Sequence, residues 1–180
     1  MKIKYKAYAK INLTLKVLGK RSDGYHEIET VMQSLELHDE LYFESAQGVN
    51  LSVEGDAPKG RDNLILRAVE LLQEYSGCDK GANISLIKRI PMAAGLAGGS
   101  TNAAATLLGL NELWGLNLDL KELMALGEKI GSDVPFCLVG GTVLARGKGE
   151  ILTPLPDAPE MGVVLIKPPF GISTAEVYEN

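Results

Sequence analysis

The N-terminal part of the chain alternates apolar and polar residues in the way that β-strands do. Within residues 3–18, apolar side chains recur at every second position, at Ile11, Leu13, Leu15 and Val17, which predicts a strand with one buried face. Residues 19–26 read GKRSDGYH and predict a loop that turns at Ser-Asp-Gly. Residues 27–45 predict two more strands, with a break near His38-Asp39.

From Asn63 onward the spacing of apolar residues changes to that of a helix. One helix is expected from Asn63 to a stop at Gly77, a second over residues 99–114, and a third opened by the capping-box pair Asp119 and Glu122. Further strands are expected at residues 49–54, 84–90, 142–146 and 163–166, and a Pro-rich linker at 154–159. This order of elements predicts an α+β domain with a mixed sheet and helices packed on one side.

The composition is that of a globular protein and limits the classes of function. Of the 180 residues, 46% are hydrophobic and 23% are charged, and the formal net charge is -5. An acidic chain is not expected to bind nucleic acid in general, although residues 1–21 carry only basic charges that could attract a phosphorylated ligand. No apolar run approaches the roughly 20 residues that span a bilayer, and the N-terminus lacks a signal-peptide pattern. We therefore expect a cytoplasmic protein with no membrane partner.

The two cysteines, Cys78 and Cys137, lie far apart in the sequence. Neither belongs to a CxxC pattern or has a histidine nearby. They therefore predict neither a disulfide framework nor a zinc site. Cys137 lies in the apolar run 134–139 and is expected to pack in the core.

The last residues of the chain resemble the start of a helix. Ser173 and Glu176 have the spacing of a capping box, but only about one helical turn follows before Asn180. We therefore expect residues 1–153 to form one domain. Residues 154–180 are then expected to be a linker and the start of a second, truncated domain.

A glycine-rich turn is expected to join the strand that stops at Pro91 to the helix at 99–114. Its sequence, PMAAGLAGGST at residues 91–101, has small residues that let the backbone approach a ligand closely. The helix that follows presents free amide groups and the positive end of its dipole, so the turn predicts a cradle for a polyphosphate. It lacks the lysine of a Walker A loop and the spacing of a Rossmann motif. The alternative is a plain turn with a serine as the helix cap.

Two charged residues would suit phosphoryl transfer if the fold brings them together. Asp133, within GSDVPF, would accept a proton from a hydroxyl group, and Lys10, within AKINL, would keep Asp133 ionised and neutralise phosphoryl charge. Alternatively, Lys10 is a solvated strand lysine, and Asp133 caps a helix that has Pro135 in its first turn. The spacing in the sequence does not decide between these interpretations.

Four blocks of sequence make the chain resemble the GHMP kinases, the family of galactokinase and of homoserine, mevalonate and phosphomevalonate kinases. The blocks are AKINLTL at 9–15, RSDGYHEIET at 21–30, IPMAAGLAGGSTNAAA at 90–105 and GSDVPFCLVGG at 131–141, with a weaker fifth, KPPFGISTAEVY, at 167–178. The resemblance covers essentially the whole chain. It implies the fold of a GHMP kinase N-terminal domain, which is similar to the second domain of ribosomal protein S5.

The resemblance also implies a reaction and its residues. The first two blocks are typical of the members that use ATP and Mg²⁺ to phosphorylate the 2-hydroxyl of 4-diphosphocytidyl-2-C-methyl-D-erythritol in non-mevalonate isoprenoid biosynthesis. It implies that Lys10 and Asp133 are catalytic. It implies that ATP is bound by Pro91, Met92, Ala93, Ala94, Gly95, Leu96, Ala97, Gly98, Gly99, Ser100 and Thr101, with Asn63 and Leu64 beside the adenosine. It implies that the acceptor is bound by Asn12, Tyr25, His26, Thr174 and Tyr178, with the cytosine between the two tyrosines.

The glycine loop departs from the family's usual sequence, GAGLGGGSS, at Ala93 and Ala97. An alanine held at positive φ costs about 1 kcal/mol, so we expect either a slightly reshaped loop or negative φ at these positions. Family members also continue for a further domain of roughly 100 residues. Two alternatives therefore stay open: another GHMP small-molecule kinase, and an inactive nucleotide-binding fragment.

Overall fold

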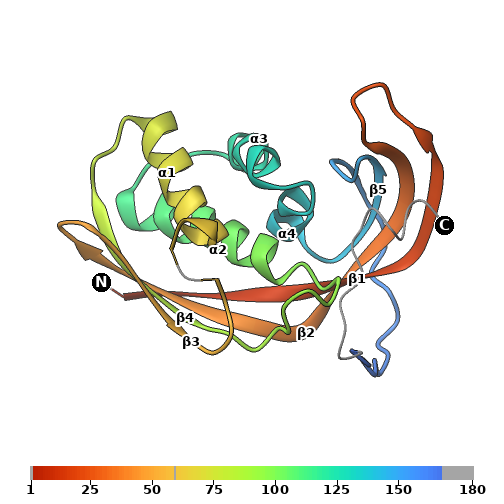
Figure 1. Cartoon of the computed structure of the whole chain (residues 1–180), viewed down its shortest axis with the longest axis horizontal. Helices are drawn as coiled ribbons and strands as arrows, with labels where there is room; N and C mark the ends of the chain where they lie inside the picture. The colour runs from red at the N-terminus through yellow and green to blue at the C-terminus, as the bar shows by residue number, and fades with distance from the viewer. Residues whose placement is uncertain (1, 59, 168–180) are drawn as a thin grey trace.

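A long antiparallel hairpin runs through the whole fold. In the computed structural model, which describes residues 2–58 and 60–167, strand β1 (Lys2–Lys20) pairs with strand β2 (His26–Ala46) along nearly its full length (Figure 1). A hydrogen bond of 2.8 Å from the Arg21 backbone N–H to the Tyr25 carbonyl oxygen closes the turn between them. The loop predicted at residues 19–26 is confirmed, although both strands extend further toward it than expected.

The other edge of β2 pairs with two different strands. Its first half pairs with β5 (Thr142–Gly147), and its second half pairs with β4 (Gly81–Ile87). Strand β3 (Val49–Glu54) lies parallel to β4, and β6 (Ile151–Pro154) lies antiparallel to β5, which completes a mixed sheet of six strands. The predicted break near His38-Asp39 is wrong, because β2 is continuous. It changes its partner from β5 to β4 in this region instead.

Helices cover one face of this sheet (Figure 1). The described part of the chain contains the short 3-10 helix η1 (Gly60–Asp62) and the helices α1 (Leu64–Ser76), α2 (Gly98–Trp114), α3 (Leu120–Ile130) and α4 (Val134–Val139). Helix α2 lies on β1 and β2 and contacts the other three α-helices. Its residues Leu107, Leu110 and Trp114 are buried with Phe43 in the main core, and each such side chain contributes about 1.5–3 kcal/mol through its burial. The predicted α+β fold with helices on one side is confirmed.

Local sequence signals account for where the helices begin and end. The side chain of Asn63 accepts a hydrogen bond from the Ile65 backbone N–H at 3.0 Å and so caps α1, and Gly77 ends the helix at a φ of 65°. Asp119 and Glu122 form the predicted capping box at the start of α3, with both reciprocal hydrogen bonds present. The helix boundaries were therefore well predicted by residue type alone.

The buried face predicted for the first strand is wrong. The side chains of Leu13, Leu15 and Val17 are each about 40% exposed, whereas Ala7 and Ala9 are buried. The first half of β1 packs under helix α2, but the second half continues with β2 as an arm that extends past the helices (Figure 1). Alternation of apolar residues therefore identified the strand correctly but did not identify which half is covered.

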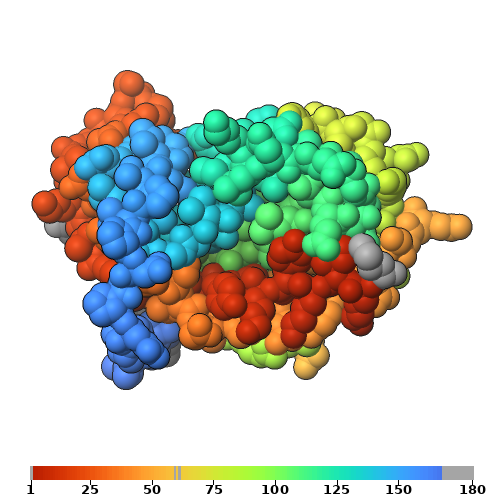
Figure 2. Space-filling view, turned by 180° about the vertical axis from the view of Figure 1, so that it is seen from behind, coloured from red at the N-terminus to blue at the C-terminus, as the bar shows by residue number. Residues whose placement is uncertain are grey.

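The strand predicted at residues 163–166 is also wrong. This segment has no regular secondary structure in the described structure, and Val164 and Ile166 are almost fully exposed. In Figure 2 the chain that follows β6 (blue) projects from the body of the molecule. Val164 and Ile166 therefore have no covering layer among the described residues.

Part of the positive charge of the N-terminal region is paired with carboxylates. Lys2 forms an ion pair with Glu44, and Lys4 forms one with Glu40, both on the neighbouring strand β2. Acidic residues of β2 thus neutralise much of the local charge.

Every helix in residues 2–58 and 60–167 is too short or too polar to cross a bilayer.

Candidate active site

A cavity of about 480 Å³ opens where the glycine loop, β1 and the start of α4 meet. The glycine loop contributes every residue from Pro91 to Ser100. The other elements contribute Lys10, Asn12, Asn63, Leu64, Lys88, Asn102, Asp133 and Lys148, among others. The cavity therefore collects predicted site residues from three of the four sequence blocks that carry the family resemblance.

The glycine loop leads into α2 without a side-chain cap. The N-cap residue is Ala97, and no described side chain accepts a hydrogen bond at this helix start. Gly98, Gly99 and Ser100, the first three helical residues, all line the cavity. The alternative of a plain turn capped by serine is therefore wrong. Uncapped amide groups and the helix dipole instead make this end of α2 suited to an anion.

Three residues of the glycine loop have a left-handed backbone conformation. Ala93 has a φ of 51°, Ala97 a φ of 56° and Gly95 a φ of 70°. Of the two outcomes expected for the alanines, negative φ is wrong, because both adopt the conformation that normally favours glycine. The loop thus keeps a curved backbone at a local cost.

Lys10 and Asp133 meet in this cavity. Lys10 Nζ lies 3.5 Å from Asp133 Oδ2 and 2.8 Å from Asn12 Oδ1, and Lys10 is only 7% exposed. Asp133 occupies the N-cap position of α4, but its side chain makes no capping hydrogen bond with a described residue. Neither alternative holds: Lys10 is not solvated, and the Asp133 carboxylate does not cap the helix.

A backbone contact joins this pair to the glycine loop. The Lys10 backbone N–H donates to the Leu96 carbonyl oxygen at 3.1 Å, and Leu96 packs with Ala9 and Ile90 in a small core cluster. Asn12 is held in turn by a 2.7 Å hydrogen bond from its Nδ2 to Thr30 Oγ1. Lys10 and the glycine loop are therefore positioned by the same short stretch of β1.

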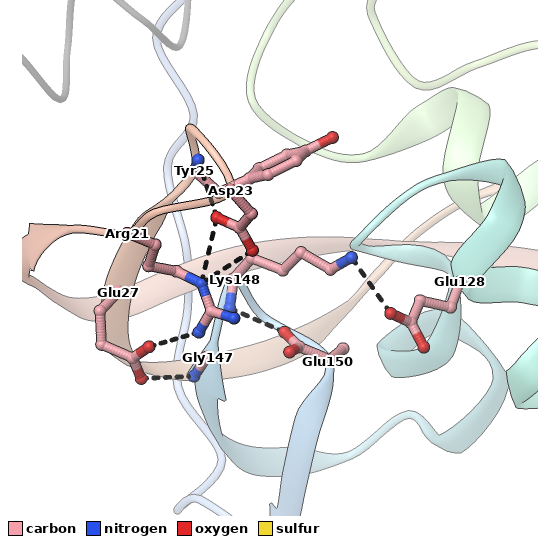
Figure 3. A network of polar contacts seen from close by, with 8 residues as sticks. All are labelled: Arg21, Asp23, Tyr25, Glu27, Glu128, Gly147, Lys148 and Glu150. Atoms are coloured by element: carbon pink, nitrogen blue, oxygen red, sulfur yellow. Dashed lines mark hydrogen bonds and ion pairs between the residues drawn. The ribbon is translucent and has the colours of Figure 1, made fainter.

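The tip of the hairpin stands beside the cavity and not inside it. Neither Tyr25 nor His26 lines the cavity in the described part of the chain, and Tyr25 is 57% exposed. Figure 3 shows how the tip is braced: Arg21 pairs with Asp23 and Glu27, while the Asp23 carboxylate accepts a 3.1 Å hydrogen bond from the Tyr25 backbone N–H. That hydrogen bond is the main cause that lowers the pKa of Asp23. The Tyr25 ring is thus presented to solvent on a fixed turn.

Lys148 links the hairpin tip to the cavity, and the sequence reasoning missed it. It extends from the turn between β5 and β6 toward Glu128 on α3, with its Nζ 3.1 Å from Glu128 Oε1 and 5.3 Å from the Tyr25 ring centroid (Figure 3). The hydrogen bond with Glu128 raises the pKa of Lys148. Lysine between two glycines in a turn is a weak signal, which only the fold makes meaningful.

The remaining predicted residues differ in their surroundings. Asn63 and Leu64 line the cavity, but both polar ends of the Asn63 side chain are used locally, in capping α1 and in a hydrogen bond to the Pro58 carbonyl oxygen. Thr101 is buried and does not line this cavity. Thr174 and Tyr178 lie outside the described residues.

The thiol of Cys137 lies close to the site but is not suited to chemistry there. Burial is the main cause that raises its pKa to about 12, and the nearby Asp133 carboxylate adds to the effect. A thiol with that pKa is protonated near neutral pH and is a poor nucleophile. Cys137 packs at the edge of the core, as its apolar surroundings in the sequence predicted.

Comparison with known proteins finds similar sequences. Residues 63–141 match the family of GHMP kinases N terminal domain. The chain is 60% identical over 175 residues to 4-diphosphocytidyl-2-C-methyl-D-erythritol kinase of Pelotomaculum thermopropionicum, covering 96% of this chain and 61% of that protein. It is 54% identical to the protein of the same name from Geobacillus kaustophilus, covering 100% of this chain and 63% of that protein. The chain thus spans a little under two thirds of the length of these relatives.

Solved structures agree on the fold. A crystal structure of 4-(cytidine 5'-diphospho)-2C-methyl-D-erythritol kinase superposes with a TM-score of 0.74 at 44% sequence identity, over 85% of this chain and 55% of that one. Mevalonate kinase of Methanococcus jannaschii superposes with a TM-score of 0.66 at 14% identity, over 86% of this chain and 55% of that one. The second likeness shows the fold alone.

Proposed function

We propose that this chain, of which residues 63–141 match the family of GHMP kinases N terminal domain, is the ATP-binding part of a kinase that phosphorylates the 2-hydroxyl of 4-diphosphocytidyl-2-C-methyl-D-erythritol. The observation that carries the proposal is the 3.5 Å approach of Lys10 to Asp133 on the cavity that the glycine loop lines. The choice of acceptor is supported by the relatives that are 50–60% identical, which are 4-diphosphocytidyl-2-C-methyl-D-erythritol kinases by name.

The proposed chemistry transfers the γ-phosphoryl group of ATP to an alcohol. Asp133 accepts the proton of the acceptor hydroxyl while the hydroxyl oxygen forms a bond to the γ-phosphorus. The bond between the γ-phosphorus and the β-phosphate oxygen breaks at the same time and leaves ADP. Lys10 keeps Asp133 ionised and stabilises the charge that develops on the transferred group. Asn12 supports this arrangement by holding the Lys10 ammonium through its side-chain oxygen.

The glycine loop supplies the phosphate cradle in this proposal. The uncapped first turn of α2 offers backbone amide groups to the phosphates, and the hydroxyl of Ser100 adds a donor at the same edge. Asn63 and Leu64 also line the cavity, and the adenosine is proposed to lie beside them.

Mg²⁺ fits the donor set of the cavity. Mg²⁺ is usually held by one or two carboxylates together with phosphate oxygens and water, and the Asp133 carboxylate and Ser100 hydroxyl both line the cavity. The described residues contain no cluster of three or more His, Cys, Asp or Glu side chains that could hold a metal ion. When bound, it would neutralise charge on the phosphates of ATP.

The acceptor is proposed to bind on the side of the hairpin tip. Tyr25 is 57% exposed and its ring would stack on a cytosine, and base–aromatic stacking contributes about 1–3 kcal/mol. His26 follows it on β2, where it would face the edge of the base, and Asn12 would lie beside the reacting hydroxyl. Thr174 and Tyr178 would complete the acceptor site.

We further propose that residues 1–153 form the ATP-binding domain and that residues 154–180 lead into a second domain. Support comes from the exposed apolar residues Val164 and Ile166, because a run of this kind usually packs against another layer.

Turnover measurements on the full-length protein test the proposed function. The protein is incubated with ATP, Mg²⁺ and, in parallel, 4-diphosphocytidyl-2-C-methyl-D-erythritol, mevalonate, homoserine or galactose, and both ADP and phosphorylated product are measured. Turnover confined to the cytidyl acceptor is expected. Preferred turnover of another alcohol would replace the acceptor assignment, and nucleotide binding without any turnover would contradict the kinase proposal.

A further inference from the structure

A second buried ion pair lies next to the glycine loop and takes no part in the proposed chemistry. Asp39 on β2 is fully buried, and its Oδ2 lies 2.9 Å from Nζ of Lys88, whose side chain is only 5% exposed. The other carboxylate oxygen, Oδ1, accepts hydrogen bonds from the backbone N–H groups of Arg89 at 2.6 Å and Ile90 at 2.8 Å. Asp39 thus holds three consecutive residues of the strand end that leads into the loop.

This arrangement explains why β4 ends at Ile87 and not at Ile90 as predicted. The backbone amides of Arg89 and Ile90 donate to the Asp39 carboxylate instead of to a neighbouring strand. The chain is therefore released from the sheet at the point where the glycine loop begins. A carboxylate at the place where β2 changes partners fixes where that release occurs.

The ammonium of Lys88 lies against the first residue of helix α2. A Cβ built on Gly98 would come within 2.9 Å of Lys88 Nζ and 3.1 Å of Ile90 Cγ2. Lys88 Nζ also donates to the Ile90 carbonyl oxygen, and Lys88 lines the cavity while Asp39 does not. A side chain at position 98 would therefore require the Lys88 ammonium to shift.

The pair is oriented with its positive end toward the cradle. Burying two charges costs desolvation that their attraction often fails to recover, so a buried ion pair is weak evidence for a stabilising role. At a helix N-terminus, an ammonium adds to the positive potential that the dipole already provides. The negative partner lies on the far side, away from the cavity.

We propose that Asp39 and Lys88 are positioning residues of the phosphate cradle. Asp39 fixes residues 88–90, which lead into the glycine loop, and Lys88 places a positive charge beside Gly98, the first residue of helix α2. This inference rests on the proposed function in that the ligand is a nucleotide. It assigns to the pair a share of the affinity for phosphate groups and none of the affinity for the nucleoside or the acceptor.

The test is calorimetric binding of ATP, ADP, AMP and adenosine to the full-length protein and to the double variant Asp39→Asn with Lys88→Met. Asparagine still accepts the two backbone hydrogen bonds, so the double variant removes charge with little change in shape. The affinity for ATP is expected to fall on the order of tenfold. The loss of affinity is expected to be smaller for ADP, smaller again for AMP, and absent for adenosine. The KM for the acceptor is expected to stay within about twofold, because this site lies away from the hairpin tip.

Two further variants keep the result interpretable. Lys88→Arg retains the charge, so the ratio of ATP affinity to adenosine affinity is expected to stay within about twofold of the wild-type ratio even if both affinities fall. Lys2→Met with Glu44→Gln removes a surface ion pair from the same sheet and is expected to change neither affinity. Melting curves report whether each variant is folded.

An equal loss of affinity for all four ligands in the double variant, or no loss for any, would overturn the inference and leave the proposed function intact. The inference would also be overturned if Lys88→Arg changed the ratio of ATP affinity to adenosine affinity as much as the double variant does. Wild-type protein that binds none of the nucleotides would instead contradict both the proposed function and this inference.

Discussion

The ammonium of Lys10, on strand β1, lies 3.5 Å from the carboxylate of Asp133, at the start of helix α4. Residues from distant parts of the chain meet because β1 and α4 both pack against α2. The backbone of Lys10 also holds the glycine loop through the Leu96 carbonyl oxygen. One strand therefore positions both the proposed catalytic pair and the phosphate cradle.

Removing the proposed base is expected to abolish most of the turnover without unfolding the protein. Asp133→Asn in the full-length protein is expected to lower kcat by about 10²- to 10⁴-fold, the usual contribution of general base catalysis. Lys10→Met is expected to lower kcat as well, and the double variant is expected to lose less than the product of the two effects because the residues act as a unit. Steady-state kinetics and melting curves measure both quantities. Fully multiplicative losses would show that the two residues act independently.

The two alanines at positive φ are expected to cost stability. Ala93→Gly and Ala97→Gly are each expected to raise the free energy of unfolding by about 0.5–1 kcal/mol, because relief of left-handed strain exceeds the entropy that glycine gains in the unfolded chain. Urea denaturation of each variant measures the change. Ala94→Gly is the matched control, since Ala94 lies in the same loop but does not have a positive φ. Ala94→Gly is expected to destabilise, and equal effects at all three positions would refute the strain argument.

The hairpin tip is expected to affect the affinity for the acceptor and not the affinity for ATP. Tyr25→Ala is expected to raise the KM for the cytidyl acceptor by about 5- to 150-fold through loss of stacking, while the KM for ATP stays within about twofold. Tyr25→Phe keeps the ring and is expected to resemble the wild type. Tyr75→Ala, which removes another half-exposed tyrosine, serves as the control. Parallel increases in both KM values would mean that Tyr25 acts through the fold and not through the acceptor.

Glu40 predicts one component of the acid sensitivity of the fold. Hydrogen bonds from Tyr42, then Arg89 and Lys4, lower the pKa of Glu40 from its ordinary 4.5 to about 2. Because the folded pKa is depressed, the stabilisation is fully present above about pH 4.5 and is lost as the pH falls toward 2. Urea denaturation between pH 6 and 2 should therefore show a smaller decline in Glu40→Gln than in the wild type. Identical declines would exclude Glu40 as a contributor.

Local signals in the sequence predicted where α1 begins and ends and where α3 begins, and the family resemblance implied that Lys10 and Asp133 belong to one site. Caps at Asn63, Gly77 and Asp119 are set by residues close to them in the sequence, so the helix limits could be read directly. The meeting of Lys10 with Asp133 depends on long-range packing. Their residue types alone left it open, and only the resemblance implied it.

The features that were missed depend on contacts between distant residues. Which half of β1 is covered depends on where α2 ends, so the exposure of Leu13 and Leu15 could not be read from their alternation. The early end of β4 depends on Asp39, a residue of another strand. Lys148 gains its place at the cavity from the turn between β5 and β6. None of these has a signal in the local pattern.

The most direct test of the kinase proposal is phosphorus NMR of the full-length protein with ATP, Mg²⁺ and 4-diphosphocytidyl-2-C-methyl-D-erythritol. One phosphomonoester signal on the acceptor is expected to appear for each ADP formed, and the rates of both are expected to fall by about 100-fold or more in Asp133→Asn. ADP formation without the acceptor phosphomonoester, or unchanged transfer in Asp133→Asn, would contradict it.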